Sequence, residues 1–238
     1  KWIALTINTT PPPYRDFPNH DVYLLPTDGA GTLKNLTPEN RGDDGGAVFA
    51  PDGKTLLFGR QETPYYSGEF TKLWRHDLAT GQNTPLTEAL DYSIDGVKFS
   101  ADGKTLWATI ESKGIVPVFK LSADGTGLTP VYAQGTSSAI DLAAGTLVFL
   151  NDNTSRPNEL FALDQASGAV RQLTHFNDAF MAQIDLGRVE SYWFEGANRE
   201  QVQGWLVYPP GYDANKKYPL IELMHGGPHT MNRDSWSY

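Results

Sequence analysis

The residues with the clearest chemical potential form a short motif near the end of the sequence, His-Gly-Gly-Pro-His at residues 225–229. An apolar run, Leu-Ile-Glu-Leu-Met at residues 220–224, precedes the motif and indicates a buried strand. A strand that ends in glycines can direct a backbone N–H at a carbonyl oxygen on which negative charge develops, because no Cβ blocks the approach of a substrate. The motif therefore predicts half of an oxyanion hole and the chemistry of acyl transfer.

The two histidines of this motif do not predict a metal site. His225 and His229 have the i, i+4 spacing that brings two ligands together on a helix. The intervening Gly-Gly-Pro forbids a helix at this place, so the spacing has no such effect here. We expect neither a metal nor any other cofactor.

Repeated hairpins dominate the sequence before this motif. Residues 48–58 (Val-Phe-Ala-Pro-Asp-Gly-Lys-Thr-Leu-Leu-Phe) return as residues 98–108 (Lys-Phe-Ser-Ala-Asp-Gly-Lys-Thr-Leu-Trp-Ala), and residues 142–149 are a worn third copy. The Asp-Gly pairs at 52–53 and 102–103 supply the positive φ angles that a tight turn needs. Alternating apolar and polar residues on either side indicate half-buried antiparallel strands.

A second short motif recurs at the same interval as the hairpins. It is a Leu-Thr pair that follows a polar turn containing glycine. These pairs lie at residues 36–37, 86–87, 128–129 and 173–174. A third strand is expected between each hairpin and the Leu-Thr pair that follows it, at residues 72–77, 116–121 and 159–163. Four strands in a period of about 40 to 50 residues are typical of a propeller blade.

The count of repeats predicts a mainly β fold with part of a β-propeller. Three whole blades are expected at residues 46–88, 94–132 and 138–174, with the later strands of another across residues 1–37. About three and a half blades are too few to close a ring, so we expect the first half of the propeller to lie outside this sequence. An open β-solenoid or a sandwich with accidental similarity is the alternative.

The composition sets limits on function. The net charge is −9, which argues against a nucleic-acid partner because such a partner demands a basic face. Cysteine is absent, which excludes disulfides, thiolate metal sites and a cysteine nucleophile. No run of 18 apolar residues occurs, so we expect no membrane-spanning helix.

The pattern changes after the last Leu-Thr pair. Residues 190–195 and 202–208 alternate between apolar and polar and predict an antiparallel pair, and residues 220–224 predict a strand within an α/β sheet. We therefore expect two domains. Residues 1–177 would be the C-terminal half of a propeller cap, and residues 178–238 a linker with the first strands of an α/β-hydrolase domain.

These motifs together resemble the prolyl oligopeptidase clan of serine peptidases. The resemblance rests on the Pro-Asp-Gly-Lys hairpin, on Gly-Trp-Leu-Val-Tyr-Pro-Pro-Gly at 204–211, on Lys-Tyr-Pro-Leu-Ile at 217–221 and on the motif at 225–229. Residues 178–190 make the sequence most similar to the acylaminoacyl-peptidase and dipeptidyl-peptidase V branch. The resemblance covers the whole chain and is strongest from residue 178 onward.

The resemblance implies a propeller that caps an α/β-hydrolase domain and admits short peptides. Ser, Asp and His would carry out acyl transfer, with the backbone N–H of Gly227 as one oxyanion donor. His225 comes too early to be the base in the clan's Ser, Asp, His order, so it is expected to brace the glycine turn. No Gly-x-Ser-x-Gly nucleophile motif occurs in these residues, so the triad is expected beyond residue 238.

Other residues are weaker candidates for contact with a ligand. A peptide's free N-terminus needs an anionic partner, and Glu62, Glu69, Glu111 and Glu195 could supply one. The aromatic residues Tyr65, Tyr66 and Phe70 lie on a long interruption within a blade and could face a ligand or cover a blade edge. Trp236 and Tyr238 follow the motif, and packing beneath the site is favoured over lining it.

Two hypotheses about function follow from the sequence. The favoured one is a serine exopeptidase of the dipeptidyl or acylaminoacyl type, whose partner is a short peptide. The alternative is a non-catalytic propeller that binds other molecules and carries a vestigial hydrolase tail. We expect neither nucleic acid nor membrane as a partner, a homo-oligomer is compatible with both hypotheses, and a periplasmic or secreted location is mildly preferred.

Overall fold

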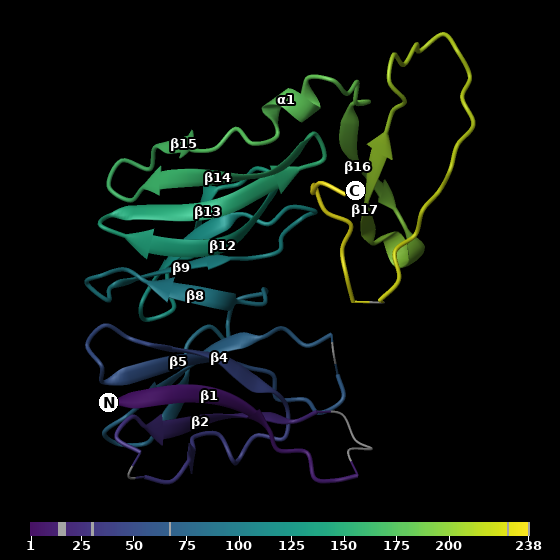
Figure 1. Cartoon of the computed structure of the whole chain (residues 1–238). Helices are drawn as coiled ribbons and strands as arrows, with labels where there is room; N and C mark the ends of the chain where they lie inside the picture. The colour runs from purple at the N-terminus through teal and green to yellow at the C-terminus, as the bar shows by residue number, and fades with distance from the viewer. Residues whose placement is uncertain (14–17, 30, 67, 228, 238) are drawn as a thin grey trace. The chain divides into compact units, whose positions relative to one another are not determined.

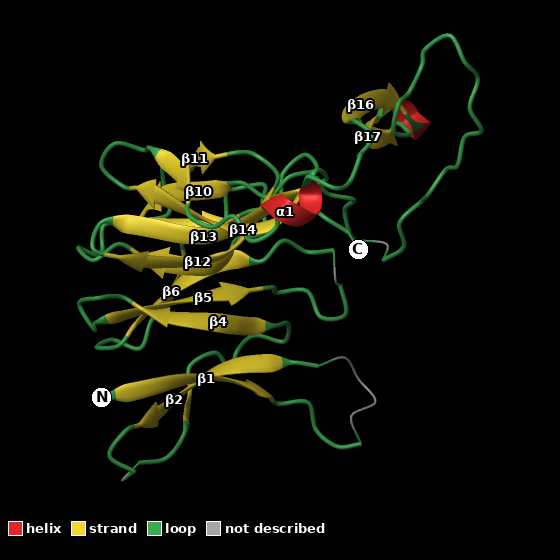
Figure 2. Ribbon diagram, turned by 45° about the horizontal axis from the view of Figure 1, so that its top comes forward, coloured by secondary structure: helices red, strands yellow, loops and turns green. Residues whose placement is uncertain are grey.

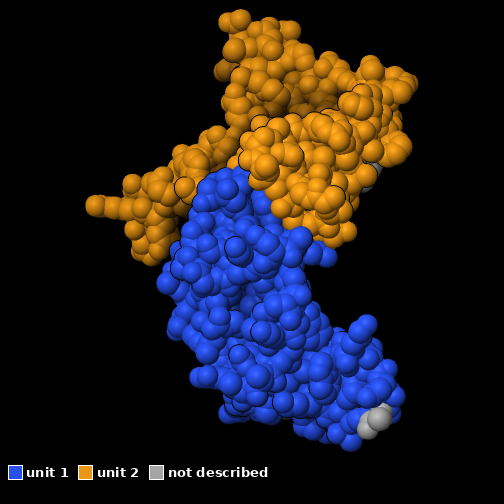
Figure 3. Space-filling view, turned by 90° about the vertical axis from the view of Figure 1, so that its left-hand side faces the viewer, with its two compact units in different colours: residues 1–110, 118–131 blue, residues 111–117, 132–238 orange. Residues whose placement is uncertain are grey.

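The computed structural model describes residues 1–13, 18–29, 31–66, 68–227 and 229–237. These residues are almost entirely strands and the turns between them, with one short α-helix and one 3₁₀ turn (Figure 2). They form two compact units, residues 1–110 with 118–131, and residues 111–117 with 132–238 (Figure 3). Among the residues that the structure describes, neither helix has the length and apolar character needed to cross a lipid bilayer.

The first unit begins with a three-stranded antiparallel sheet. Its order is β1 (Trp2–Asn8), β2 (His20–Pro26) and β3 (Lys34–Asn35). Apolar residues alternate along β2, so one face of the sheet buries Val22 and Leu24. Leu36, which directly follows β3, is buried with them. This sheet is the partial blade that the sequence predicts.

Two complete four-stranded sheets follow in the first unit, each with its strands in chain order. One contains β4 (Asp44–Phe49), β5 (Thr55–Arg60), β6 (Lys72–Asp77) and β7 (Asn83–Pro85). The next contains β8 (Asp95–Phe99), β9 (Thr105–Thr109), β10 (Val118–Ser122) and β11 (Thr129–Tyr132). Leu57, Leu73 and Leu106 from the two sheets lie in one buried cluster. Such shared burial is how neighbouring blades stabilise one another.

The second unit contains the last four-stranded sheet and a separate hairpin (Figure 1). The sheet consists of β12 (Thr136–Ala143), β13 (Thr146–Asn153), β14 (Arg156–Asp164) and β15 (Val170–Gln172). Helix α1 (Asp178–Met181) follows, and then β16 (Val189–Glu195) and β17 (Gln201–Val207) pair around the 3₁₀ turn Ala197–Arg199. Three complete blades, a partial blade and the later strand pair are thus confirmed.

The Asp-Gly turns differ in one detail from the expectation. Only the glycines have positive φ, +65° at Gly53 and +69° at Gly103. The aspartates instead accept a hydrogen bond from the backbone two residues later, as in the 2.9 Å contact between Asp52 Oδ1 and the N–H of Lys54. Each pair thus supplies the positive φ that was expected of it through its glycine, and the carboxylate of the aspartate stabilises the turn by a hydrogen bond instead.

The Leu-Thr pairs have a structural role that explains their recurrence. In three of the four pairs the threonine Oγ1 accepts the backbone N–H of a residue in the next-to-last strand of the sheet that the pair follows. The pairs of donor and acceptor are Val22 with Thr37, Leu73 with Thr87 and Leu160 with Thr174, at 2.8–3.0 Å. The fourth, Thr129, donates instead to the carbonyl of Gly127 at 3.0 Å. In these three sheets a threonine hydroxyl therefore accepts the hydrogen bond of a strand N–H, a bond that a carbonyl of a neighbouring strand would otherwise accept.

A buried ion pair stabilises the first complete blade. Arg60 Nε donates to Asp44 Oδ1 at 2.7 Å, and both side chains are almost fully buried. The guanidinium also donates to Glu39 at 2.8 Å and lies 4.4 Å from the centre of the Trp74 ring. Burial raises the pKa of Asp44 to about 6, although Arg60 acts in the opposite direction.

Candidate functional site

The apolar run before the glycine motif is not a strand in this structure. Residues 220–224 have no regular secondary structure, and Leu220, Ile221, Leu223 and Met224 are 80–87% exposed. The predicted strand is therefore wrong for this chain. The inner strand of a sheet needs neighbours on both edges to satisfy its N–H and C=O groups, and no strand of the described residues pairs with this run.

Gly227 occupies a backbone conformation that favours glycine. Its φ is +147°, and a Cβ at this position would lie 2.9 Å from Cγ2 of Thr230. At Gly226, in contrast, a Cβ would meet no atom within 4 Å. The two glycines of the motif therefore differ in how strictly the local structure requires them.

His225 lies exposed beside this turn. Its Nδ1 is 3.3 Å from the carbonyl oxygen of Gly226, within the same motif. The bracing role of His225 and the donor role of Gly227 both stay predictions. Pro228, the residue between Gly227 and His229, and Tyr238 at the end of the sequence lie outside the described residues.

The residues just after the motif, 231–236, form what we call the anchor segment, because they are held by several hydrogen bonds within the second unit. Asp234 is the centre of this network. Its Oδ1 accepts the N–H and the Oγ1–H of Thr154 at 2.8 and 2.9 Å, and its carbonyl accepts the Oγ1–H of Thr136 at 2.9 Å. Its own N–H donates to the carbonyl of Gly114 at 2.7 Å. Asp234 thereby joins the loops at Gly114 and Thr154 and the first residue of β12, Thr136.

Further contacts extend the anchor segment on both sides of Asp234. Trp236 is half-buried, and its backbone N–H donates to Asp152 Oδ1 at 3.1 Å. Arg233 donates to Glu111 at 2.8 Å, and both of these side chains are exposed. The expected packing of Trp236 beneath the site stays a prediction, since this contact comes from its backbone.

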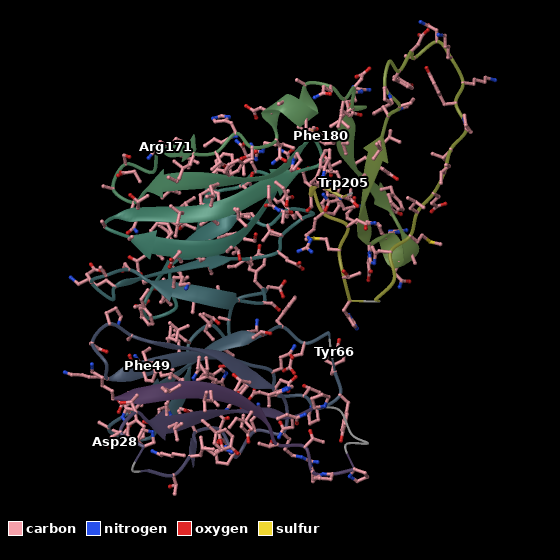
Figure 4. All side chains as sticks on the ribbon, in the orientation of Figure 1. Asp28, Phe49, Tyr66, Arg171, Phe180 and Trp205 are labelled. Atoms are coloured by element: carbon pink, nitrogen blue, oxygen red, sulfur yellow. The ribbon has the colours of Figure 1, made fainter. Side chains whose placement is uncertain are left out.

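The β16–β17 hairpin contacts the same segment. The indole N–H of Trp205, labelled on β17 in Figure 4, donates to the carbonyl of Asn232 at 2.9 Å. Gln203 Nε2 donates to the carbonyl of Lys113 at 3.0 Å and to Ser191 Oγ at 2.8 Å. The side chain of Trp205 therefore links β17 to the anchor segment, and Gln203 links β17 to the loop at Lys113.

Two of the four candidate carboxylates have partners within the chain. Glu69 accepts the N–H of Thr63 at 2.7 Å and so stabilises its own loop, and Glu111 pairs with Arg233. Glu62 and Glu195 are exposed, Glu195 at the end of β16. Glu62 and Glu69 belong to the first unit and Glu111 and Glu195 to the second, and no group of three or more metal-ligating side chains occurs among the described residues.

Tyr65 and Tyr66 line a pocket of about 350 Å³ in the first unit. Asn19 and Arg41 line the same pocket and bring polar groups to it. Figure 4 labels Tyr66 on the loop that follows β5. Phe70 instead lies against Lys72, whose Nζ is 5.0 Å from the centre of the ring. Of the three aromatic residues, Tyr65 and Tyr66 therefore line the pocket, and Phe70 packs against Lys72.

Comparisons with known proteins identify the chain's relatives. No family model matches the sequence. A probable dipeptidyl-peptidase 5 of Emericella nidulans is 30% identical over 254 residues, which include 100% of this chain and 35% of the relative. This chain is a homologue of dipeptidyl-peptidase 5. It spans about a third of the length of that relative, and the predicted resemblance to the acylaminoacyl-peptidase and dipeptidyl-peptidase V branch of the prolyl oligopeptidase clan is confirmed.

Solved structures agree with the fold of this dipeptidyl-peptidase 5 homologue. An acylaminoacyl peptidase in complex with Z-Gly-Gly-Phe-chloromethyl ketone is similar with a TM-score of 0.78, over 99% of this chain and 35% of that one, at 20% identity. The β-propeller domain of the Trilobed protease from Pyrococcus furiosus is similar with a TM-score of 0.57, over 77% of this chain and 52% of that one, at 20% identity. The sheets of this chain are therefore propeller blades.

Sequence reasoning missed Asp234, the residue with the densest contacts in this region. It lies in Arg-Asp-Ser-Trp at residues 233–236, which has no catalytic spacing and no helical or strand periodicity. The one indication in the sequence was that Asp234 lies only seven residues after Gly227. The partners Gly114, Thr136 and Thr154 come from segments 80 to 120 residues earlier, so only folding brings them together.

Proposed function

We propose that this chain is part of a serine exopeptidase that releases dipeptides or acylated amino acids from short peptides. The observation that carries the proposal is the glycine turn at residues 225–229 in a homologue of dipeptidyl-peptidase 5. A serine would attack the scissile carbonyl, a histidine would transfer the proton to the leaving amine, and an aspartate would orient the histidine. We place these three residues beyond residue 238.

Gly227 would contribute one half of the oxyanion hole. Its backbone N–H would donate to the oxygen of the tetrahedral intermediate, together with the N–H of the residue after the nucleophile. Removal of one such donor costs about 3–4 kcal/mol of transition-state stabilisation in other serine hydrolases. The positive φ of Gly227 supports this role, because a residue with a Cβ would be strained in that conformation and would lie 2.9 Å from Cγ2 of Thr230, whereas a Cβ at Gly226 would meet no atom within 4 Å.

We place the boundary between the two predicted domains at residues 177 and 178. The last blade strand ends at Gln172, and α1 begins at Asp178. Asn177 donates through its backbone N–H to the buried Glu159 of β14 at 2.8 Å, which ties the end of the propeller part to its last blade. Residues 178–238 would then start the peptidase domain.

The test uses the full-length protein from the gene that encodes this chain. We expect a fluorophosphonate probe to label one serine, and we expect cleavage of either a dipeptidyl or an N-acetyl-aminoacyl chromogenic substrate. Cleavage of the first substrate would show that the enzyme accepts a free N-terminus. Cleavage of the second would show that it accepts an acetylated N-terminus. A full-length protein with no labelled serine and no cleavage of either substrate would favour the non-catalytic propeller and overturn the proposal.

A pair of glycine variants tests the role of Gly227. Gly227→Ala should lower kcat/KM by about 10²–10³, because a displaced oxyanion donor acts mainly in the transition state. Gly226→Ala is the matched control, since a Cβ there meets open space, and its effect should be less than about tenfold. Equal losses in the two variants would contradict a specific role of Gly227.

A further inference from the structure

A tight turn between β9 and β10 belongs to the second unit. Residues 111–117 are grouped with that unit, although the two strands that they connect belong to the first. At the centre of the loop Ser112 and Ile115 exchange two backbone hydrogen bonds, at 3.0 and 3.1 Å. The backbone of Val116 bonds to Gly135 and Ser137 at 2.9 Å, which fixes the loop beside the first residues of β12.

The two central residues of this turn both have positive φ, +50° at Lys113 and +76° at Gly114. Positive φ at both central residues is the mark of a type I′ turn, in which asparagine, aspartate or glycine is usual. A lysine is disfavoured in that conformation because its Cβ crowds the backbone. Strain of this kind persists where the surrounding contacts hold the conformation in place.

The backbone of the turn bonds to both the hairpin and the anchor segment. The carbonyl of Lys113 accepts the Nε2–H of Gln203 at 3.0 Å. Gly114 is buried, and its N–H donates to Met231 Sδ at 3.2 Å, while its carbonyl accepts the N–H of Asp234 at 2.7 Å. The strained turn thus directs three backbone groups at residues that follow it by about 90 to 120 positions.

The packing around Gly114 excludes a side chain at this position. A Cβ would lie 2.7 Å from Cζ2 of Trp205 and 2.9 Å from Nε2 of Gln203. The amide of Gln203 ends a flexible side chain, but the indole of Trp205 is held by its N–H bond to the carbonyl of Asn232 at 2.9 Å. A larger residue at 114 would therefore displace the indole and break that bond.

We propose that the Lys113-Gly114 turn is a docking site that holds the β16–β17 hairpin to the propeller. The hairpin lies after residue 178, the proposed start of the peptidase domain, and the turn lies before it. A two-stranded hairpin is marginally stable by itself, so its contacts with other segments keep it formed. The inference rests on the proposed domain boundary and not on peptidase activity.

The test measures hydrogen–deuterium exchange by mass spectrometry in the full-length protein without substrate. In Gly114→Ala, peptides covering residues 201–207 should exchange at least about tenfold faster, and peptides of β5 should keep the wild-type rate. Peptides covering residues 231–236 should change less, by about threefold, because Asp234 keeps its bonds to Thr136 and Thr154.

Gly81→Ala is the matched control for backbone strain. Gly81 has the same φ of +76°, but a Cβ there would meet no atom within 4 Å. This variant should leave exchange in residues 201–207 within about twofold of the wild type. Equal exchange in the two variants, or faster exchange throughout the Gly114→Ala protein, would overturn the inference.

A double variant tests the contact with Trp205. Trp205→Phe removes the indole N–H and the part of the ring nearest Gly114. Addition of Gly114→Ala to Trp205→Phe should then speed exchange by less than about threefold, because the two changes act on one contact. A full effect of Gly114→Ala in both backgrounds would contradict the proposed docking.

Gln203→Ala provides a second route if Gly114→Ala fails to fold. It removes the donor to Lys113, so exchange in residues 201–207 should rise by about three- to tenfold. Gln203 also donates to Ser191, and Ser191→Ala is the control that removes only that bond, with an effect of less than about twofold. Equal rates in these two variants would overturn the inference. A full-length protein without peptidase activity would overturn the proposed function alone, since exchange is measured without substrate.

Discussion

Two apolar runs in this chain have similar composition and different structures. Residues 55–58 (Thr-Leu-Leu-Phe) lie in β5, where Leu56, Leu57 and Phe58 are at most 1% exposed. Residues 220–224 (Leu-Ile-Glu-Leu-Met) form no strand, and their apolar side chains are at least 80% exposed. The first run has β4 and β6 on its two edges, and the second pairs with no described strand. An apolar run thus becomes a strand only where other segments satisfy its backbone.

The ends of the two runs also differ. The strand β5 ends at Arg60, which is buried and paired with Asp44, whereas residues 220–224 lead into the exposed His225. The buried end is stable because Arg60 and Asp44 are paired, whereas His225 at the exposed end lies beside the carbonyl of Gly226. The comparison predicts that substitutions will have large effects in the blades and small effects in the glycine-turn region on the stability of this chain.

The largest effect is expected at the buried end of β5. Arg60→Ala leaves the carboxylate of Asp44 buried without its cation, which should lower the free energy of unfolding by about 3–5 kcal/mol. Urea denaturation followed by tryptophan fluorescence measures the change. Arg233→Ala, which breaks the exposed pair with Glu111, should cost less than about 1 kcal/mol. Similar costs in the two variants would remove the proposed difference between the regions.

A direct comparison of the two apolar runs comes next. Leu57→Ala should lower the free energy of unfolding by about 2–5 kcal/mol, because it creates a cavity in the cluster that two blades share. Leu220→Ala in the same chain should change it by less than about 0.5 kcal/mol, since that side chain is 82% exposed. A strong effect of Leu220→Ala would show that residues 220–224 are buried in solution.

The pH dependence of stability should identify the buried carboxylate. Because the pKa of Asp44 is raised from 3.8 to about 6, the folded chain binds a proton more readily than the unfolded chain between these values. Acidification from pH 7 to pH 4 should therefore stabilise the wild type relative to Asp44→Asn, by about 2–3 kcal/mol. Urea denaturation at a series of pH values gives this difference.

Glu39 should show the opposite sign. Burial raises its pKa, but the hydrogen bond from Arg60 and the nearby positive charge outweigh burial, so the net pKa is lowered. Its contribution to stability is present above the pKa of the unfolded chain and is lost as the pH falls through the lower folded value. Relative to Glu39→Gln, the wild type should therefore lose stability on acidification. The same sign in both comparisons would contradict the assignment of Asp44.

The smallest difference in stability is expected between two threonines of the recurring Leu-Thr pairs, Thr87 and Thr129. Thr87→Val should cost about 1–3 kcal/mol, because the buried N–H of Leu73 loses the hydroxyl that accepts it. Thr129→Val should cost less than about 0.5 kcal/mol, since its hydroxyl lies on the surface and contacts only Gly127. Thermal unfolding of the two variants tests whether the hydroxyl acceptor explains the recurrence of the Leu-Thr pair.

Most of the propeller could be predicted from the sequence because its information is local and repeated. The hairpins at residues 48–58 and 98–108 each contain their own turn and their own alternation of apolar residues. The ion pair of Arg60 and Asp44 could not be predicted, because its two residues lie on separate strands, β5 and β4, and only the pairing of those strands brings them together. The contacts of Asp234 were missed for the same reason, since they join segments more than 75 residues apart.

The sequence by itself determined the periodic strands, the His-Gly-Gly-Pro-His motif at residues 225–229 and the similarity to a peptidase clan, since these depend on residue types at short spacings. Only the tertiary structure decided which apolar runs became strands and which polar residues gained partners. Leu57 is buried and Leu220 is exposed although both are leucines in apolar runs. The physical reason is that backbone hydrogen bonds and apolar burial are satisfied between segments, so each outcome depends on what lies beside a residue in space.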